Sequence, residues 1–108
     1  MILPLELRQK DVTLPPAMAD DVRERARRLE RHVDRITRCR VTVEGSGKHH
    51  RQGRYSVVID LSVPGAEIVI RKQEARNLEL ALKKAFDSAE RCLEDRQSRR
   101  RGFVKIHG

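Results

Sequence analysis

DVRERARRLERHVDRITRCRVTVE, residues 21–44, is the stretch that decides the fold, because the spacing of its apolar residues changes partway along. From Met18 to Ile36 the apolar residues recur every three or four positions, which predicts one amphipathic helix. From Cys39 to Val43 they alternate with polar residues, which is typical of a strand with one buried face. A helix that leads directly into a strand indicates a domain in which helices pack on a sheet.

Alternating apolar residues also predict strands at residues 2–8, 54–63 and 66–72. Pro4 lacks an amide hydrogen, so the first strand should lie at a sheet edge. Because a helix connects them within one sheet, the first two strands should pair in parallel. The last two strands should form a hairpin, and the free edge of the fourth would permit a homodimer.

Two polar residues are candidate helix caps. Thr13 would cap the first helix, and Asn77 would cap a second helix that should fray or project near Arg99, with Gly102 stopping it. The predicted order is β-α-β-β-β-α. We therefore expect an α+β domain at residues 1–98, with a four-stranded mixed sheet, two helices on one of its faces, and a basic tail or linker at residues 99–108.

The composition points to a polyanionic partner. The chain has 108 residues and a formal net charge of +8, with one Tyr, two Phe and no Trp. Nucleic acid or the ribosome is the first candidate, an anionic membrane surface the second and an acidic substrate the third. The scarcity of aromatic residues argues against a base-stacking platform. No apolar run approaches the roughly 20 residues of a membrane span, and no signal segment is evident, so we expect a cytoplasmic protein.

Three segments resemble the family of ribosome hibernation factors, which comprises the hibernation-promoting factors, ribosome-associated inhibitor A and the sigma-54 modulation proteins. They are RLERHVDRIT at residues 28–37, RYSVVIDLSVPGAEIVI at residues 54–70 and LELALKKAFDSAERCLE at residues 78–94. The resemblance implies a fold similar to a double-stranded RNA-binding domain. It also implies binding to the small ribosomal subunit in the channel for messenger and transfer RNA, where the protein would block the A and P sites.

The same resemblance implies that the basic helix faces contact ribosomal RNA, and a basic loop at residues 45–53 is a further candidate for phosphate contact. The candidate residues are Arg23, Arg27, Arg28, Arg31, Arg35, Lys48, His49, Arg51, Lys83, Lys84 and Arg91. A helix face rich in arginine can also be simply solvated, with Glu24 and Glu30 paired to its arginines. The loop can likewise be an ordinary mobile connection.

Two other functions remain open. A general double-stranded RNA-binding or RNA-chaperone module would carry the same charge, and a protein-interaction domain would use Leu80, which lies opposite the apolar stripe of the second helix. No residues are spaced as a catalytic pair or a phosphate-binding loop, so we expect neither an enzyme nor a cofactor. His49 and His50 alone do not make a metal site. Cys39 and Cys92 should be reduced thiols in the core.

Overall fold

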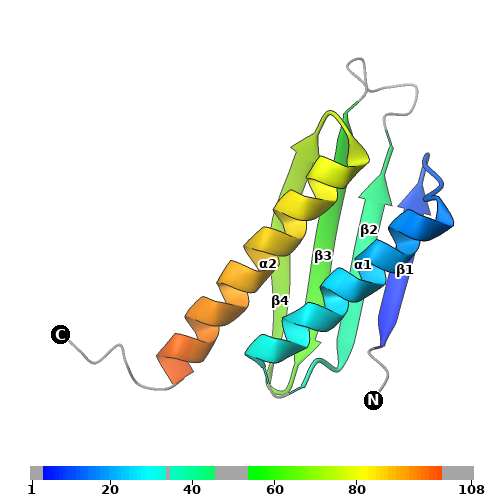
Figure 1. Cartoon of the computed structure of the whole chain (residues 1–108). Coiled ribbons are helices and arrows are strands. Elements are labelled where there is room, and N and C mark those ends of the chain that lie inside the picture. The colour runs from blue at the N-terminus through cyan, green and yellow to red at the C-terminus, as the bar shows by residue number, and fades with distance from the viewer. Residues whose placement is uncertain (1–3, 34, 46–53, 101–108) are drawn as a thin grey trace.

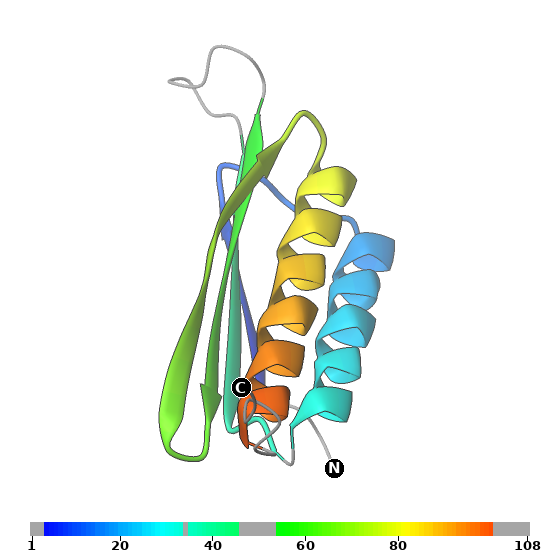
Figure 2. The same ribbon diagram turned by 90° about the vertical axis from the view of Figure 1, so that its left-hand side faces the viewer.

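The sheet has four strands and carries both helices on one face (Figures 1 and 2). The computed structural model describes residues 4–33, 35–45 and 54–100. In chain order the elements are β1 (Leu5–Lys10), α1 (Pro16–Leu29), the 3-10 turn η1 (Glu30–His32), β2 (Arg38–Glu44), β3 (Tyr55–Val63), β4 (Ala66–Ala75) and α2 (Leu78–Arg100). The strand order is β1-β2-β3-β4, with β1 parallel to β2 and the other pairs antiparallel. The predicted α+β fold is confirmed.

The edge strands extend further along the chain than predicted. β1 runs from Leu5 to Lys10. The carbonyl of Pro4, the residue just before this strand, accepts a hydrogen bond from the Cys39 amide (2.9 Å). β4 continues to Ala75 because a bulge opposite the segment between Val57 and Ile59 absorbs an extra residue and lets pairing resume. The homodimer through the free edge of β4 stays a prediction.

The start of α1 differs from the predicted cap. Pro15 occupies the N-cap position, and no side chain caps the helix there. Thr13 lies two residues too early for its hydroxyl to reach the first free amides of the helix. The Gln9 side-chain oxygen instead accepts a hydrogen bond from the Leu14 amide (2.6 Å), which fixes the chain just before the helix.

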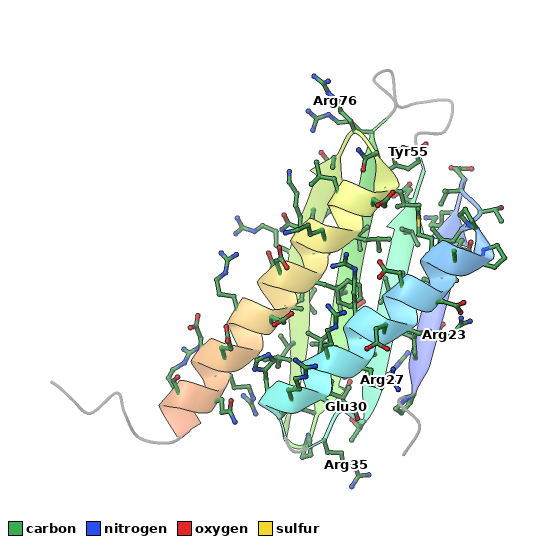
Figure 3. All side chains as sticks on the ribbon, viewed as in Figure 1. Arg23, Arg27, Glu30, Arg35, Tyr55 and Arg76 are labelled. Atoms are coloured by element: carbon green, nitrogen blue, oxygen red, sulfur yellow. The ribbon has the colours of Figure 1, made fainter. Side chains whose placement is uncertain are left out.

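The end of α1 is also earlier than predicted. Regular helix ends at Leu29, η1 follows, and Val33 is extended. Ile36 is still buried, at 3% exposure, but it reaches the core from the connection to β2. Arg35 therefore lies beyond the helix, and its assignment to the face of the first helix is wrong (Figure 3). The chain has to leave the helix early in order to reverse into β2.

The core lies between the sheet and the two helices and is built mainly from aliphatic side chains. Val22 and Leu29 of α1, Leu82 of α2, and Val41 and Ile59 of the sheet are almost inaccessible to solvent. Burial of this apolar surface is the main force that holds the helices on the sheet.

The start of α2 is as predicted. The Asn77 side-chain oxygen accepts a hydrogen bond from the Leu80 amide (2.8 Å), which is a standard N-cap. Leu80 itself is exposed, as its position opposite the apolar stripe predicts. The helix continues to Arg100, past the predicted boundary between residues 98 and 99.

Gly45 sits where the chain leaving β1 crosses the end of β2. Its amide donates to the Lys10 carbonyl (2.8 Å), and a Cβ at this position would lie 2.9 Å from both the Asp11 carbonyl carbon and the Val12 Cβ. We expect Gly45→Ala to lower the free energy of unfolding by about 1–3 kcal/mol, because a methyl group forced into this contact must displace backbone. Urea unfolding followed by circular dichroism measures the change.

Gly65 provides the matched control. It adopts φ +85°, and a Cβ there would meet no atom within 4 Å. Asparagine tolerates this left-handed backbone, so Gly65→Asn should lose much less stability than Gly45→Ala. Equal losses for the two variants would contradict the steric explanation for Gly45.

Candidate nucleic-acid interface

The outward face of α1 and η1 presents a row of arginines. Arg23 and Arg27 have side chains that are 63% and 66% exposed, and they project from the flank of α1 that is away from α2 (Figure 3). Arg28 is about half exposed, and Arg31 extends the row onto η1. Helical steps of three and four residues place these cations one turn apart, a spacing suited to a series of phosphates.

Most of these arginines pair with acids one turn earlier in α1. The pairs are Arg23–Asp20 (2.9 Å), Arg25–Asp21 (2.8 Å), Arg27–Glu24 and Arg28–Glu24 (4.0 Å). The hydrogen bond from Arg27 is the main reason why the pKa of the Glu24 carboxyl lies below its usual value. Glu30 forms no ion pair with a described residue. Exposed pairs of this kind contribute little stability, so a phosphate can replace the carboxylate at small cost.

The helix layer as a whole is close to charge balance. Residues 16–32 carry five arginines and four carboxylates, and residues 78–100 carry six cations and five carboxylates. Within the first of these segments, however, three of the four acids precede Arg25, and four arginines follow at positions 25–31. Positive charge therefore gathers at the C-terminal end of α1, where it also complements the helix dipole.

The cations of α2 point in different directions. Lys83 bonds to Asp87 (3.0 Å), whereas the Lys84 amine turns toward the sheet edge and donates to the Glu74 carbonyl of β4 (3.2 Å). Successive residues of a helix are about 100° apart, which explains why these two neighbours diverge. Arg91 is exposed and forms no ion pair with the described part of the chain.

A polar contact joins the two helical segments. His32 Nε2 of η1 lies 3.4 Å from Glu90 Oε2 of α2, and the His32 side chain is only 17% exposed. This contact, together with the shared core beneath, holds α1 and α2 side by side on the sheet (Figure 1). The basic residues of both helices thus belong to one layer of the domain.

The structure brings most of the predicted site residues onto this layer. Arg23, Arg27 and Arg28 lie on α1, Arg31 lies on η1, and Lys83, Lys84 and Arg91 lie on α2. Arg35 is displaced beyond the end of α1. The loop residues Lys48, His49 and Arg51 lie outside the described residues.

The opposite face of the sheet is also charged, but its cations share carboxylates. Glu6 of β1 lies within ion-pair distance of Arg8 (2.8 Å), Arg40 (3.2 Å) and Arg38 (3.8 Å). Hydrogen bonds from Arg8 and Arg40 hold the pKa of the Glu6 carboxyl below its usual value. Arg54 similarly lies 3.8 Å from Glu74. Its arginines therefore provide control positions for substitutions in the helix layer.

Arg96 is a residue that the sequence analysis missed. The apolar stripe of α2 ends at Leu93, and the residues beyond it include no further apolar position of that stripe. Arg96 nevertheless follows Leu93 by three positions and Cys92 by four, which places it on the same side of the helix. Its side chain is partly buried, and its Nε atom has no hydrogen-bond partner. Helical periodicity carried one turn further would have found it.

The two cysteines differ in their surroundings. Both are free thiols; Cys39 is fully buried in β2, whereas Cys92 is only partly buried on α2. Burial is the main cause that raises the pKa of the Cys39 thiol to about 12, and nearby Asp60 adds to it. No three metal-ligating side chains cluster anywhere in the described ranges, and none of the helices described there is long and apolar enough to cross a membrane.

Residues 5–101 match the profile of the family described as Sigma 54 modulation protein / S30EA ribosomal protein. The chain is 35% identical over 89 residues to the ribosome hibernation promotion factor of Deinococcus radiodurans, a match that covers 82% of this chain and 46% of that protein. The chain therefore spans about half the length of this curated relative.

Two solved structures share the fold. The N-terminal domain of Protein Y from Thermus thermophilus superposes with a TM-score of 0.71 at 22% identity, and the match covers 88% of this chain and 98% of that domain. A ribosomal subunit interface protein from Coxiella burnetii superposes with a TM-score of 0.63 at 16% identity over 93% and 99% of the two chains. With nearly all of its length matched by the family profile, the chain belongs to the Sigma 54 modulation protein / S30EA ribosomal protein family.

Proposed function

We propose that this domain binds the small ribosomal subunit in the cytoplasm and inhibits translation by occupying the channel for messenger and transfer RNA at the A and P sites. The observation that carries the proposal is the family match over residues 5–101. The name of the Deinococcus relative, a ribosome hibernation promotion factor, supports the same function.

The outward face of α1 and η1, where positive charge gathers, is the surface best suited to meet ribosomal RNA. Its exposed arginines, with Arg27, Arg28 and Arg31 at the centre, would contact phosphates at the spacing that the helical segments give them. Recognition would depend on shape and backbone charge, because the domain has few aromatic side chains to stack on bases. The action is steric, so the chain needs no catalytic group for it.

Co-sedimentation with ribosomes and separated subunits tests this function. We expect the protein to pellet with the small subunit at physiological salt and to be released as salt rises, because phosphate contacts displace counterions. Prior filling of the P site with transfer RNA should reduce the bound fraction, since both ligands would need the same channel.

A short double-stranded RNA, used as a competitor, distinguishes the second candidate. A hibernation factor should stay on the small subunit in excess duplex, whereas a general double-stranded RNA-binding module should move to the duplex. Absence of pelleting at physiological salt, or binding that filled P sites leave unchanged, would overturn the proposed occlusion.

A further inference from the structure

An open pocket lies between the C-terminal half of α2 and the edge strand β4. It has a volume of about 420 Å³ and is lined by Ile68, Cys92, Arg96 and Arg99. The three α2 residues follow one another at steps of four and three, so they share one side of the helix. Ile68 forms the wall that belongs to the sheet. This flank is distinct from the outward helix faces described above.

The guanidinium of Arg96 contains a buried nitrogen without a hydrogen-bond partner. Within the described residues, its Nε is the single buried side-chain nitrogen or oxygen atom without a hydrogen-bond partner. Buried polar groups are almost always paired, because an unpaired one loses its water and gains nothing in return. An acceptor that entered the pocket would let the guanidinium turn and recover this lost hydrogen bond.

The charges around the pocket favour an anionic ligand. Two guanidinium groups line it, and the described lining residues include no carboxylate. Neither Arg96 nor Arg99 forms an ion pair with a described residue, although Arg99 Nε donates to the Asp95 carbonyl at 3.4 Å. The planar fork of arginine matches the oxygens of a phosphate, and Ile68 and Cys92 offer an apolar surface for the adjoining sugar.

We propose that this pocket binds a phosphate group of the RNA backbone and gives the domain a contact on its β4 flank. The inference rests on the proposed function, in that the RNA would be that of the small subunit. Lys84 extends the same flank toward the helix start, where it already reaches β4 through the Glu74 carbonyl. The bound RNA would therefore pass around the side of α2 as well as over its outward face.

Cys92 is a built-in reporter of the pocket, because it is one of the four lining residues. Cys39 should not be alkylated, since it is fully buried and its thiol pKa is raised to about 12. The experiment measures the rate of alkylation of each cysteine by iodoacetamide at pH 8, with and without small ribosomal subunits, by mass spectrometry of the peptides. We expect saturating subunits to slow alkylation of Cys92 by about tenfold, as the pocket is then mostly occupied.

A double variant distinguishes RNA that binds to the pocket arginines from a subunit that merely covers Cys92. The double substitution Arg96→Gln and Arg99→Gln should lower the affinity for the small subunit, measured by co-sedimentation, by about tenfold or more, because two charged contacts are lost. The matched control is Arg38→Gln with Arg71→Gln, which removes the same charge from the open sheet face and should leave both affinity and Cys92 protection as in the wild type. Circular dichroism confirms that each variant is folded.

The outcomes distinguish the two proposals. If the protein pelleted with the small subunit but the rate of Cys92 alkylation did not change, phosphate binding in the pocket would be overturned and the proposed function would stand. Unaltered affinity of the Arg96→Gln, Arg99→Gln variant would also overturn the pocket, even if Cys92 were protected. Failure of the wild-type protein to pellet would overturn the proposed function, and the pocket inference with it.

Discussion

A variant with four alanine substitutions is expected to bind the small ribosomal subunit about 10²–10³-fold more weakly near physiological salt. The substituted residues are Arg27, Arg31, Lys83 and Lys84. Each cation that neutralises a phosphate releases counterions, so four lost contacts should also reduce the slope of log affinity against log salt by about 3. These side chains are exposed in α1, η1 and α2, and their removal leaves the core intact. Co-sedimentation over a series of salt concentrations measures both quantities.

The control for this variant removes the same charge from the other side of the domain. Arg8, Arg38, Arg54 and Arg71 are exposed and lie on the sheet side, and the first three share carboxylates there. Their replacement by alanine should change the affinity by no more than about threefold, because charges distant from the bound RNA are screened. A similar loss in both variants would show that net charge, and not the helix layer, determines binding.

Phe86→Ala is expected to be the most damaging single substitution for stability. Phe86 lies on the buried face of α2 and is 2% exposed. Removing a buried phenyl ring loses its transfer free energy and leaves a cavity, at a cost of about 3–5 kcal/mol. For a domain of this size the melting temperature should fall by at least about 12 °C. Thermal unfolding followed by circular dichroism measures the shift.

Leu80→Ala is the matched control on the same helix. Leu80 is 43% exposed on the opposite face, so its truncation should change the free energy of unfolding by less than about 0.5 kcal/mol. If Phe86→Ala cost less than about 1 kcal/mol, the packing of α2 on the sheet would not be the main source of stability.

Local patterns predicted most of the fold correctly. Alternation in Cys39–Val43 and along β3 identified the buried face of each strand, and the strands predicted at residues 54–63 and 66–72 form the expected hairpin. The Asn77 cap was also predictable, because it needs only the helix that follows it. These features depend on residues within a few positions of one another.

The boundaries and partners that were missed depend on contacts across the fold. α1 ends at Leu29, although apolar spacing continues to Ile36, because Ile36 fills the core equally well from the connection to β2. The Thr13 cap was wrong because the N-cap of α1 is Pro15, two residues later. The Gln9 side chain accepts a hydrogen bond from the Leu14 amide just before that position.

By itself the sequence determined the order of the elements, the buried face of each one, and membership of a family whose profile spans residues 5–101. Only the tertiary structure decided which cations share a surface. In the structure Arg35 lies beyond the end of α1 (Figure 3), and the Lys84 amine bonds to the edge strand β4. Arg96 and Arg99 line a pocket together with Ile68. The physical reason is that hydrophobic period and caps act within one turn or strand, whereas the direction of a long cationic side chain depends on which neighbouring element lies within its reach.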